Sequence, residues 1–442
     1  MPDSSHYKDT FSTRPPRTRH SHFTRFPSPS RLFALLIFPL LLTACPQEEE
    51  STARIWTNRA EFASYAELFN SSYSTHRIIV EYVENPAHAF REVGPGPEAP
   101  DIVIADNLTL EEMKKEFATL EGLFSDGLLD ENRFYSGLIT QGLYERQHVV
   151  LPVSFSLPMF VFESDNSPDS LSPFFISLNR LRELSVNFNV EDEHGLEKLG
   201  LSPLWEEEML FTATLMFGAD YHTTKTGMPA WNGSAIEQTI EFMQGWIQEG
   251  NGGITKEQEF ADKFLYEPPY MLIDKGRIRF YYHDIASFYA IPPKKRSHLD
   301  YRWPAKDEKI PVSPSVLYMG IPHGAPGIAT AKEFISWFFR TETQQKLLAA
   351  SDYKRVRSFG IAGGFSSLQQ VNEEIMPRLY PFLVGHIPKE DFFSFPRTVP
   401  LSWNSLQEQV IEPWLARRLR NGSEVDSLAV EIEKWLRQRP EG

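Results

Sequence analysis

The sequence predicts an α/β protein that begins with a layered domain of helices on a parallel sheet, and three observations lead to this fold class. Residues 101–105 read Asp-Ile-Val-Ile-Ala, a nearly unbroken apolar strand of the kind that helices cover on both faces. Strand patterns and helix patterns alternate between residues 54 and 107. The chain of 442 residues is also long enough for two domains that each bury a core.

The first elements bring polar side chains to the ends of strands. Residues 54–57 and 77–83 predict two strands, the second rich in β-branched side chains, and the segment between them carries apolar residues at helical spacing. A Pro/Gly-rich loop at 93–100 precedes the strand at 101–105. Ligands of such sheets bind beyond the carboxyl ends of the strands. The polar residues at those ends are Asn58, Arg59, Asp106 and Asn107.

Residues 148–162 are extended and apolar, but they contain Pro152 and Pro158. Proline is poorly tolerated in a central strand, because it cannot donate a hydrogen bond to its neighbour. We therefore expect two strands in this segment, with a crossing of the chain between them.

The remainder of the chain continues to mix helices with short strands. A turn and a strand are expected over 274–283, and further strands and loops over 304–324. Apolar periodicity predicts helices over 178–188, 234–248, 331–348, 404–419 and 425–436. The sequence shows neither internal repeats nor heptads.

The N-terminal segment has the three parts of a secretory signal. A basic stretch is followed by an apolar run over 32–42, which is shorter than the roughly 20 residues of a membrane-spanning helix. The run ends in Leu-Thr-Ala-Cys45, which resembles the lipobox of bacterial lipoproteins, where the cysteine is acylated and becomes the new N-terminus. We expect residues 1–44 to be the signal peptide and 45–52 the lipid anchor and tether, with Cys45 as the lipidation site.

Composition excludes several classes of function. The formal net charge of −15 argues against nucleic-acid binding, which requires clustered cations. Cys45 is the only cysteine, so disulfides and cysteine metal sites are excluded from the mature chain. The sequence contains neither a phosphate-binding Gly-x-x-x-x-Gly-Lys-Ser/Thr loop nor a His-Glu-x-x-His metal motif. We expect no cofactor and no metal.

With this layout the chain resembles the extracellular solute-binding proteins of ABC importers, in the sugar-binding branch that includes maltose-binding protein. The resemblance covers about residues 53–438. The matching segments, in chain order, are 55–59 (Ile-Trp-Thr-Asn-Arg), 100–107 (Pro-Asp-Ile-Val-Ile-Ala-Asp-Asn), 151–155, 275–282 (Lys-Gly-Arg-Ile-Arg-Phe-Tyr-Tyr), 319–324, 331–338 and 342–345.

This resemblance implies a two-lobed periplasmic-binding-protein fold of type II, with a ligand cleft between the lobes. Strands that cross at the hinge are expected near 151–155 and near 281–284. The implied domains are an N-lobe of 53–152 plus 284–345 and a C-lobe of 153–283 plus 346–442. Ligand would close the lobes by hinge motion, and the closed form would dock on the permease.

The family places ligand-binding groups at strand ends and near the crossings. Sugar sites combine planar polar groups for the hydroxyls with aromatic faces for the C–H side of the ring. Trp403 is expected to be such a stacking aromatic, because Ser402-Trp-Asn opens a helix where sugar binders often carry one. At 153–155 the acidic residue of maltose-type binders is missing, which leaves the ligand class open. The candidate ligand-binding residues are Asn58, Arg59, Asp106, Asn107, Ser154, Phe155, Trp205, Tyr282, His283, Trp403 and Asn404.

The expected partners are a carbohydrate ligand, the transmembrane subunits of an ABC permease and, through the lipid, the membrane; the protein itself is expected to be a monomer. One alternative is a ligand-sensing lipoprotein of the same fold for a non-sugar solute, such as a peptide or a polyamine. Another is a surface glycoside hydrolase with two catalytic carboxylates. The acidic run 206–208 predicts a solvated helix face, and no Gly-x-Ser-x-Gly motif occurs. We therefore expect no enzymatic activity.

Overall fold

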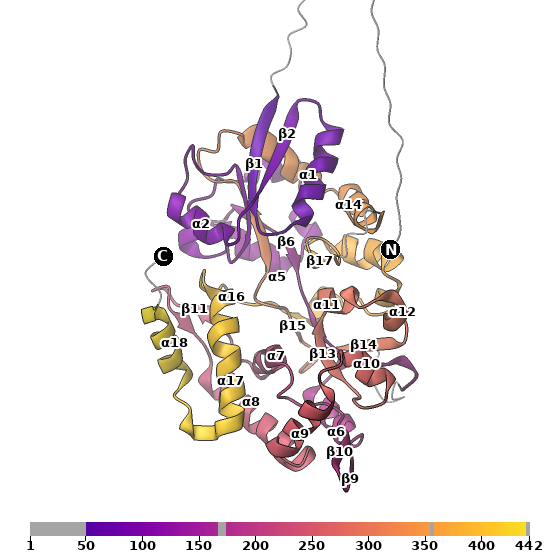
Figure 1. Cartoon of the computed structure of the whole chain (residues 1–442). Coiled ribbons are helices and arrows are strands. Elements are labelled where there is room, and N and C mark those ends of the chain that lie inside the picture. Colours follow the sequence, from indigo (N-terminus) through magenta and orange to yellow (C-terminus); the bar gives the residue numbers. More distant parts are fainter. Residues whose placement is uncertain (1–49, 167–173, 354–357, 439–442) are drawn as a thin grey trace, which may run out of the picture. The chain divides into compact units, whose positions relative to one another are not determined.

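The computed structural model describes residues 50–166, 174–353 and 358–438, which form one compact unit (Figure 1). The predicted signal peptide and lipidation site, including Cys45, lie outside the described residues. The first strand begins at Ser51, so the last two residues of the predicted tether belong to the sheet. Among the helices that the structure describes, none combines the length and the apolar character needed to cross a membrane.

A six-stranded sheet organises the first lobe, and we call this sheet with its helices the N-lobe. Its strand order is β17-β6-β16-β3-β1-β2; β1, β2 and β3 are parallel, and β16 runs antiparallel to both β3 and β6. The strands are β1 (Ser51–Thr57), β2 (His76–Tyr82), β3 (Ile102–Asp106), β6 (Val150–Phe155), β16 (Leu317–Gly320) and β17 (Phe365–Ser366). The predicted strands at 54–57, 77–83 and 101–105 are thus confirmed as β1, β2 and β3.

Helices cover this sheet through aromatic side chains. The predicted apolar face of α1 is buried, and Phe62 and Phe69 contact the rings of Phe338 and Phe334 on α13 at 5.8 and 5.4 Å. The segment predicted as one helix over 331–348 is two helices, which meet near Arg340. The N-lobe helices are α1 (Glu61–Ser72), α2 (Pro86–Val93), α3 (Glu111–Lys114), α4 (Glu121–Ser125), α5 (Ser136–Ile139), α13 (Ile328–Phe338), α14 (Thr341–Tyr353) and α15 (Met376–Leu379).

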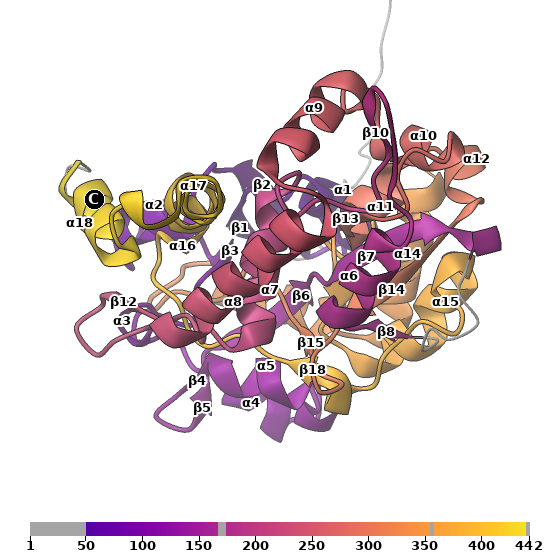
Figure 2. The same cartoon turned by 90° about the horizontal axis from the view of Figure 1, so that it is seen from below.

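A four-stranded sheet organises the second lobe, the C-lobe, with the order β13-β7-β14-β8. Its strands are β7 (Pro158–Glu163), β8 (Phe175–Ile176), β13 (Tyr281–Asp284) and β14 (Leu299–Pro304). Helices α7, α8 and α17 contact one another beside it (Figures 1 and 2). The remaining helices are α6 (Leu178–Val186), α7 (Glu207–Phe217), α8 (Gly233–Gly245), α9 (Ile254–Phe264), α10 (Pro269–Asp274), α11 (Ile285–Ala290), α12 (Pro293–Arg296), α16 (Trp403–Leu406), α17 (Glu412–Asn421) and α18 (Leu428–Gln438).

Four short two-stranded ladders complete the strands of the described residues. Three of them are antiparallel hairpins, and the fourth, β15 with β18, pairs two distant segments in parallel. The strands are β4 (Leu143–Tyr144), β5 (Gln147–His148), β9 (Val190–Asp192), β10 (Gly195–Lys198), β11 (His222–Thr223), β12 (Pro229–Ala230), β15 (Ile310–Pro311) and β18 (Phe393–Ser394).

The chain passes between the two sheets at a place that the prolines predict. Strand β6 lies in the N-lobe sheet and β7 in the C-lobe sheet, so the crossing is at residues 156–157. Pro152 stays inside β6, where the pairing with β16 shifts register, and Pro158 opens β7. The prediction of two strands with a crossing between them is confirmed, but residues 153–155, expected in the C-lobe, belong to β6 in the N-lobe sheet.

The second crossing differs from the prediction. Residues 281–284 form β13, which pairs with β7 inside the C-lobe sheet, and β14 pairs with the other edge of β7. The chain returns to the N-lobe sheet only at β16, so this connection spans 305–316, and residues 284–304 do not join the N-lobe sheet. Strand β17, expected in the C-lobe, pairs with β6 in the N-lobe, and the chain passes back over 395–402.

Candidate functional site

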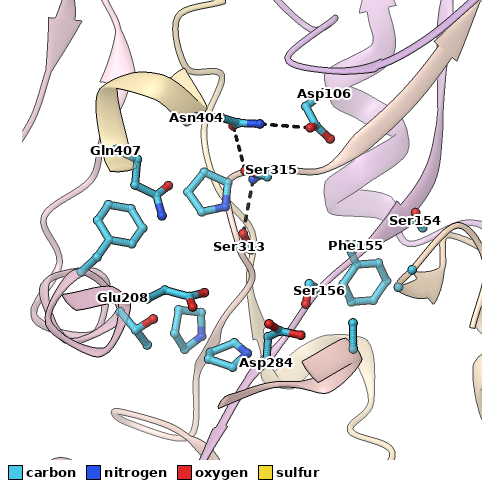
Figure 3. A pocket seen from close by; sticks show the side chains of 18 of the residues that line it. Asp106, Ser154, Phe155, Ser156, Glu208, Asp284, Ser313, Ser315, Asn404 and Gln407 are labelled. Carbon is cyan, nitrogen blue, oxygen red and sulfur yellow. Dashed lines mark hydrogen bonds between the residues drawn. The ribbon is translucent and has the colours of Figure 1, made fainter. Parts of the chain in front are cut away.

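A cavity of about 460 Å³ lies where the strand ends of the N-lobe face helices of the C-lobe (Figure 3). We call its two sides the N-lobe wall and the C-lobe wall. The N-lobe wall includes Asn58, Arg59, Asp106, Ser154 and Phe155. The C-lobe wall includes Glu208, Thr212, Tyr282, Asp284, Asn404, Gln407 and Glu408, and Ser313 and Ser315 line the cavity from the connection between the lobes.

The N-lobe wall is organised around Asp106, the last residue of β3. Arg59 follows β1 and reaches both carboxylate oxygens of Asp106 from one guanidinium nitrogen, at 3.2 Å each. Strands β1 and β3 are neighbouring and parallel, which brings their carboxyl ends together. Burial raises the pKa of Asp106, while Arg59 and the amide of Asn404 oppose that rise.

Hydrogen bonds join Asp106 to the other lobe. The side-chain amide of Asn404, on α16, donates to Asp106 Oδ2 at 3.0 Å, and its oxygen accepts from the Ser315 hydroxyl at 2.9 Å (Figure 3). The backbone N–H of Ser315 in turn lies 3.4 Å from the Ser313 hydroxyl. The network therefore connects a strand end of the N-lobe, a helix of the C-lobe and the segment between them.

The C-lobe wall is acidic. Glu208 lies in the first turn of α7, and the repeat Glu208, Phe211, Thr212 and Leu215 places one face of this helix on the cavity. Asp284 caps α11 by accepting hydrogen bonds from the backbone N–H and the hydroxyl of Ser287, both at 2.8 Å. Partial burial, together with the nearby charges of Asp284 and Glu412, raises the pKa of Glu208 to about 7, although a hydrogen bond with Tyr282 opposes the rise.

Seven of the eleven predicted ligand-binding residues line this cavity: Asn58, Arg59, Asp106, Ser154, Phe155, Tyr282 and Asn404. Phe155 and Tyr282 are nearly buried, and the Tyr282 hydroxyl lies 2.8 Å from the hydroxyl of Thr212. The lining therefore offers polar groups and ring edges rather than a broad exposed aromatic face.

Trp403 does not line the cavity, and the expectation of a stacking tryptophan is wrong. Its side chain is 0% exposed and packs against the rings of Tyr221 and Phe211, at 5.3 and 6.1 Å. Its indole N–H donates to Gln407 at 3.0 Å. Successive helical residues point about 100° apart, so Asn404 reaches the cavity while Trp403 enters the core.

Three other predicted residues also lie away from the cavity. Trp205 stacks on Phe260 at 5.8 Å, so packing accounts for its ring. His283 alternates with Tyr282 along β13 and therefore faces the other side, against the ring of Tyr281 at 5.3 Å; burial lowers its pKa. Asn107 is nearly buried at a positive φ of 64°, and it lines an adjoining cavity of about 220 Å³ that shares Asn58, Asp106 and Asn404 with the main one.

Several residues of the C-lobe wall were not predicted from the sequence, chiefly Glu208, Asp284, Gln407 and Glu408. The acidic run 206–208 predicts a solvated helix face, although the spacing of Glu208, three and four residues from Phe211 and Thr212, could have placed it on the face that lines the cavity. The serines at 313 and 315 sit in a connection whose path the sequence does not reveal. No cluster of His, Cys, Asp and Glu suited to a metal ion occurs within residues 50–166, 174–353 and 358–438.

The chain shares its fold with sugar-binding proteins of ABC transport systems. No model of a protein family matches the sequence, and no curated protein matches it. The sugar-binding protein MalE from Xanthomonas citri is 13% identical, with a TM-score of 0.62 over 88% of this chain and 100% of that one. The cyclic α-maltosyl-1,6-maltose binding protein from Arthrobacter globiformis is 15% identical, with a TM-score of 0.57 over 87% and 97%.

A third neighbour is an ABC substrate-binding protein from Listeria monocytogenes in complex with cycloalternan. It is 12% identical, with a TM-score of 0.56 over 88% of this chain and 97% of that one. The neighbours are described as binding proteins and not as enzymes, and the alignments span nearly their whole length. The chain therefore has the two-lobed fold of MalE-like type II periplasmic binding proteins.

Proposed function

We propose that this protein is the solute-binding component of an ABC importer, exported and anchored to the bacterial membrane through a lipid on Cys45. It binds a sugar or an oligosaccharide between the lobes and delivers it to a membrane permease. The observation that carries this proposal is the cavity bridged by Asp106 and Asn404, in a fold shared with proteins that bind maltosyl-maltose and cycloalternan.

The polar groups of the cavity suit hydroxyl recognition. A carboxylate accepts hydrogen bonds at two oxygens, a guanidinium donates in a planar fork, and an amide does both. Asp106, Arg59, Asn58 and Asn404 present these groups side by side on the lining. A ligand that touches both walls stabilises the arrangement in which the lobes are close, which is how ligand binding would be coupled to docking on a permease.

Thermal unfolding with a panel of mono- and oligosaccharides tests sugar binding. The chain from residue 46 onward is suitable, because the described residues from 50 form one compact unit. A sugar at a hundredfold excess over its Kd should stabilise the protein by about 2.7 kcal/mol. The shift should be lost in Asp106→Asn and kept in the control Asp126→Asn, an exposed N-lobe residue away from the cavity. Recovery of the sugar unchanged separates binding from hydrolysis, and silence across the panel contradicts the proposal.

Anchoring and delivery need the full chain in cells. The protein should be found in the membrane fraction, and Cys45→Ser should release it from that fraction or block its maturation. A strain that lacks the protein should take up less of the labelled sugar, and the wild type should restore uptake while Asp106→Asn should not. Normal uptake in the deleted strain would contradict delivery and favour a sensing role.

A further inference from the structure

The two walls of the cavity differ in charge. Arg59 is the only Lys or Arg side chain on the lining, and it is paired with Asp106 at 3.2 Å. The remaining acidic residues of the lining are Glu208, Asp284 and Glu408. Across the part of the chain that the structure describes, none of these three has a Lys, Arg or His within 4.0 Å. The C-lobe wall therefore presents three carboxylates without a cationic partner.

Two of these carboxylates are directed to the same part of the cavity. Figure 3 shows the side chains of Glu208 and Asp284 reaching toward one another from α7 and from the start of α11. Asp284 is held in place by its two hydrogen bonds to Ser287. Its negative charge disfavours ionisation of Glu208, as does Glu412 from the neighbouring helix α17. A positive group placed between them would remove this repulsion.

The N-lobe wall has polar groups without hydrogen-bond partners in the described part of the chain, which indicates that the cavity receives a polar ligand. Ser154 is 4% exposed, lines the cavity, and its hydroxyl has no hydrogen-bond partner among the described residues. Asn58 Oδ1 and Arg59 Nε are also buried without a partner. Buried polar groups are nearly always hydrogen-bonded in folded proteins. The Ser154 hydroxyl is therefore expected to bond to a ligand with donors and acceptors such as hydroxyls, whereas Asn58 Oδ1 and Arg59 Nε, which are closed to solvent, can reach one only through a small shift of their side chains.

We propose that the ligand carries a protonated amine, which binds against Glu208 and Asp284, while its hydroxyl groups bond to the N-lobe wall at Ser154, Asn58 and Arg59. The ligand class that combines these groups is an amino sugar or an oligosaccharide of amino sugars. The saccharide part of this inference rests on the proposed function, whereas the requirement for a cation rests on the C-lobe wall itself.

Calorimetric titration with matched saccharides tests the inference at neutral pH. Each probe is used in three forms that differ only in the group at C-2 of each ring: the free amine, the N-acetyl amide and the hydroxyl, as in the β-1,4-linked disaccharides of glucosamine, N-acetylglucosamine and glucose. Galacto- and manno-configured sets extend the series. The amine of the best set should bind at least tenfold more tightly than its two neutral counterparts, and 0.5 M KCl should reduce this preference.

The variant Glu208→Gln keeps the shape of the side chain and removes its charge. It should weaken binding of the amine at least tenfold and change binding of the neutral sugars less than threefold. Glu207→Gln is the matched control, because it removes the same charge one residue earlier on α7 and does not line the cavity. The control should bind both forms as the wild type does.

The outcomes separate this inference from the proposed function. Equal affinity for amine and neutral sugar would overturn the inference and leave the sugar-binding function intact. Binding of spermidine, sensitive to Glu208→Gln, with no response to any saccharide would overturn the sugar function and support the requirement for a cation. No binding by any probe would contradict both.

Discussion

The N-lobe wall and the C-lobe wall of the cavity differ in whether their carboxylates have a cationic partner within the protein. On the N-lobe wall Asp106 receives a guanidinium and an amide within 3.2 Å. On the C-lobe wall Glu208 and Asp284 face the cavity without a cation. A carboxylate that is neutralised within the protein can position other groups, whereas one that is not neutralised selects the charge of what binds. The carboxylate of the N-lobe wall therefore holds neighbouring groups in position, whereas the carboxylates of the C-lobe wall favour a ligand that carries positive charge.

The first experiment asks whether Trp403 packs in the core behind the C-lobe wall or contacts the ligand, and it should produce the largest loss of stability. Trp403→Ala should reduce the free energy of unfolding by about 3–5 kcal/mol, because it removes a fully buried ring from the contacts with Phe211 and Tyr221. Urea denaturation measures this loss, and Tyr266→Ala, which removes a 78% exposed ring, should change stability little. If the Trp403→Ala protein were as stable as wild type but no longer bound sugar, Trp403 would be a ligand-contacting residue after all.

A second experiment removes the cation from the N-lobe wall and makes it resemble the C-lobe wall. Arg59→Ala should cost about 2 kcal/mol at pH 7, a value reduced for the partial exposure of Arg59, because Asp106 stays in a buried position without its partner. The cost should shrink as the pH falls, since the pKa of Asp106 is already raised by burial and rises further without Arg59. In an Asp106→Asn background the same substitution should cost less.

The surface pair of Arg77 with Glu50 provides the control for this comparison. Its atoms are 3.6 Å apart and both side chains are more than half exposed. Arg77→Ala should therefore cost less than about 0.5 kcal/mol at any pH. If both arginine variants lost the same stability, Asp106 would not be the buried anchor described above.

The third experiment neutralises one carboxylate of the C-lobe wall. The pKa of Glu208 rises from its ordinary 4.5 to about 7 in the folded protein. The folded state then holds the proton more tightly than the unfolded state, so this group lowers stability as the pH rises between those values. Glu208→Gln should be more stable than wild type by roughly 1 kcal/mol at pH 8, a figure discounted for solvent exposure, and equal to it at pH 4. Thermal unfolding across this range, with Glu207→Gln as control, measures the difference.

The smallest effect concerns Asn107, beside Asp106 on the N-lobe side. Its φ of 64° is a conformation that glycine adopts freely and alanine resists. Asn107→Gly should leave stability within about 0.5 kcal/mol, and Asn107→Ala should cost about 1 kcal/mol. Binding of the best saccharide should be the same in both, since Asn107 does not line the main cavity. Loss of binding in Asn107→Gly would extend the N-lobe wall to this residue.

The two walls also differ in how many of their residues could be predicted from the sequence. Asn58, Arg59 and Asp106 were found because parallel strands end at one edge, and apolar runs reveal where such strands end. Asn404 was found through a resemblance that also pointed to Trp403, and the resemblance could not decide which of two adjacent helical residues faces the cavity. Glu208 was not predicted, because three adjacent glutamates are expected to face solvent when it is not known what the helix packs against.

The second crossing was misplaced for a related reason. The Tyr-rich segment of β13 and the segment of β14, which alternates apolar with charged residues, have the character of strands, but nothing in their sequence indicates which sheet they join. Their partner, β7, accepts one of them on each edge. β17 has only two residues, too few for any pattern. Strand identity is a local property of the chain, whereas strand partnership is decided by the packing of the whole lobe.

The pairing of β15 with β18 has a mechanical consequence. Strand β15 belongs to the second passage of the chain between the lobes and β18 directly precedes the third, and the N–H of Val312 donates to the oxygen of Ser394 at 3.0 Å beside their ladder. The step at 156–157 lies beside the same ladder, because the N–H of Ser313 donates to the oxygen of Ser156 at 3.2 Å. All three passages are thus linked side by side in one narrow band. Neighbouring segments linked in a row permit bending about the line that joins them, so the lobes would rotate about this band and resist sliding against one another.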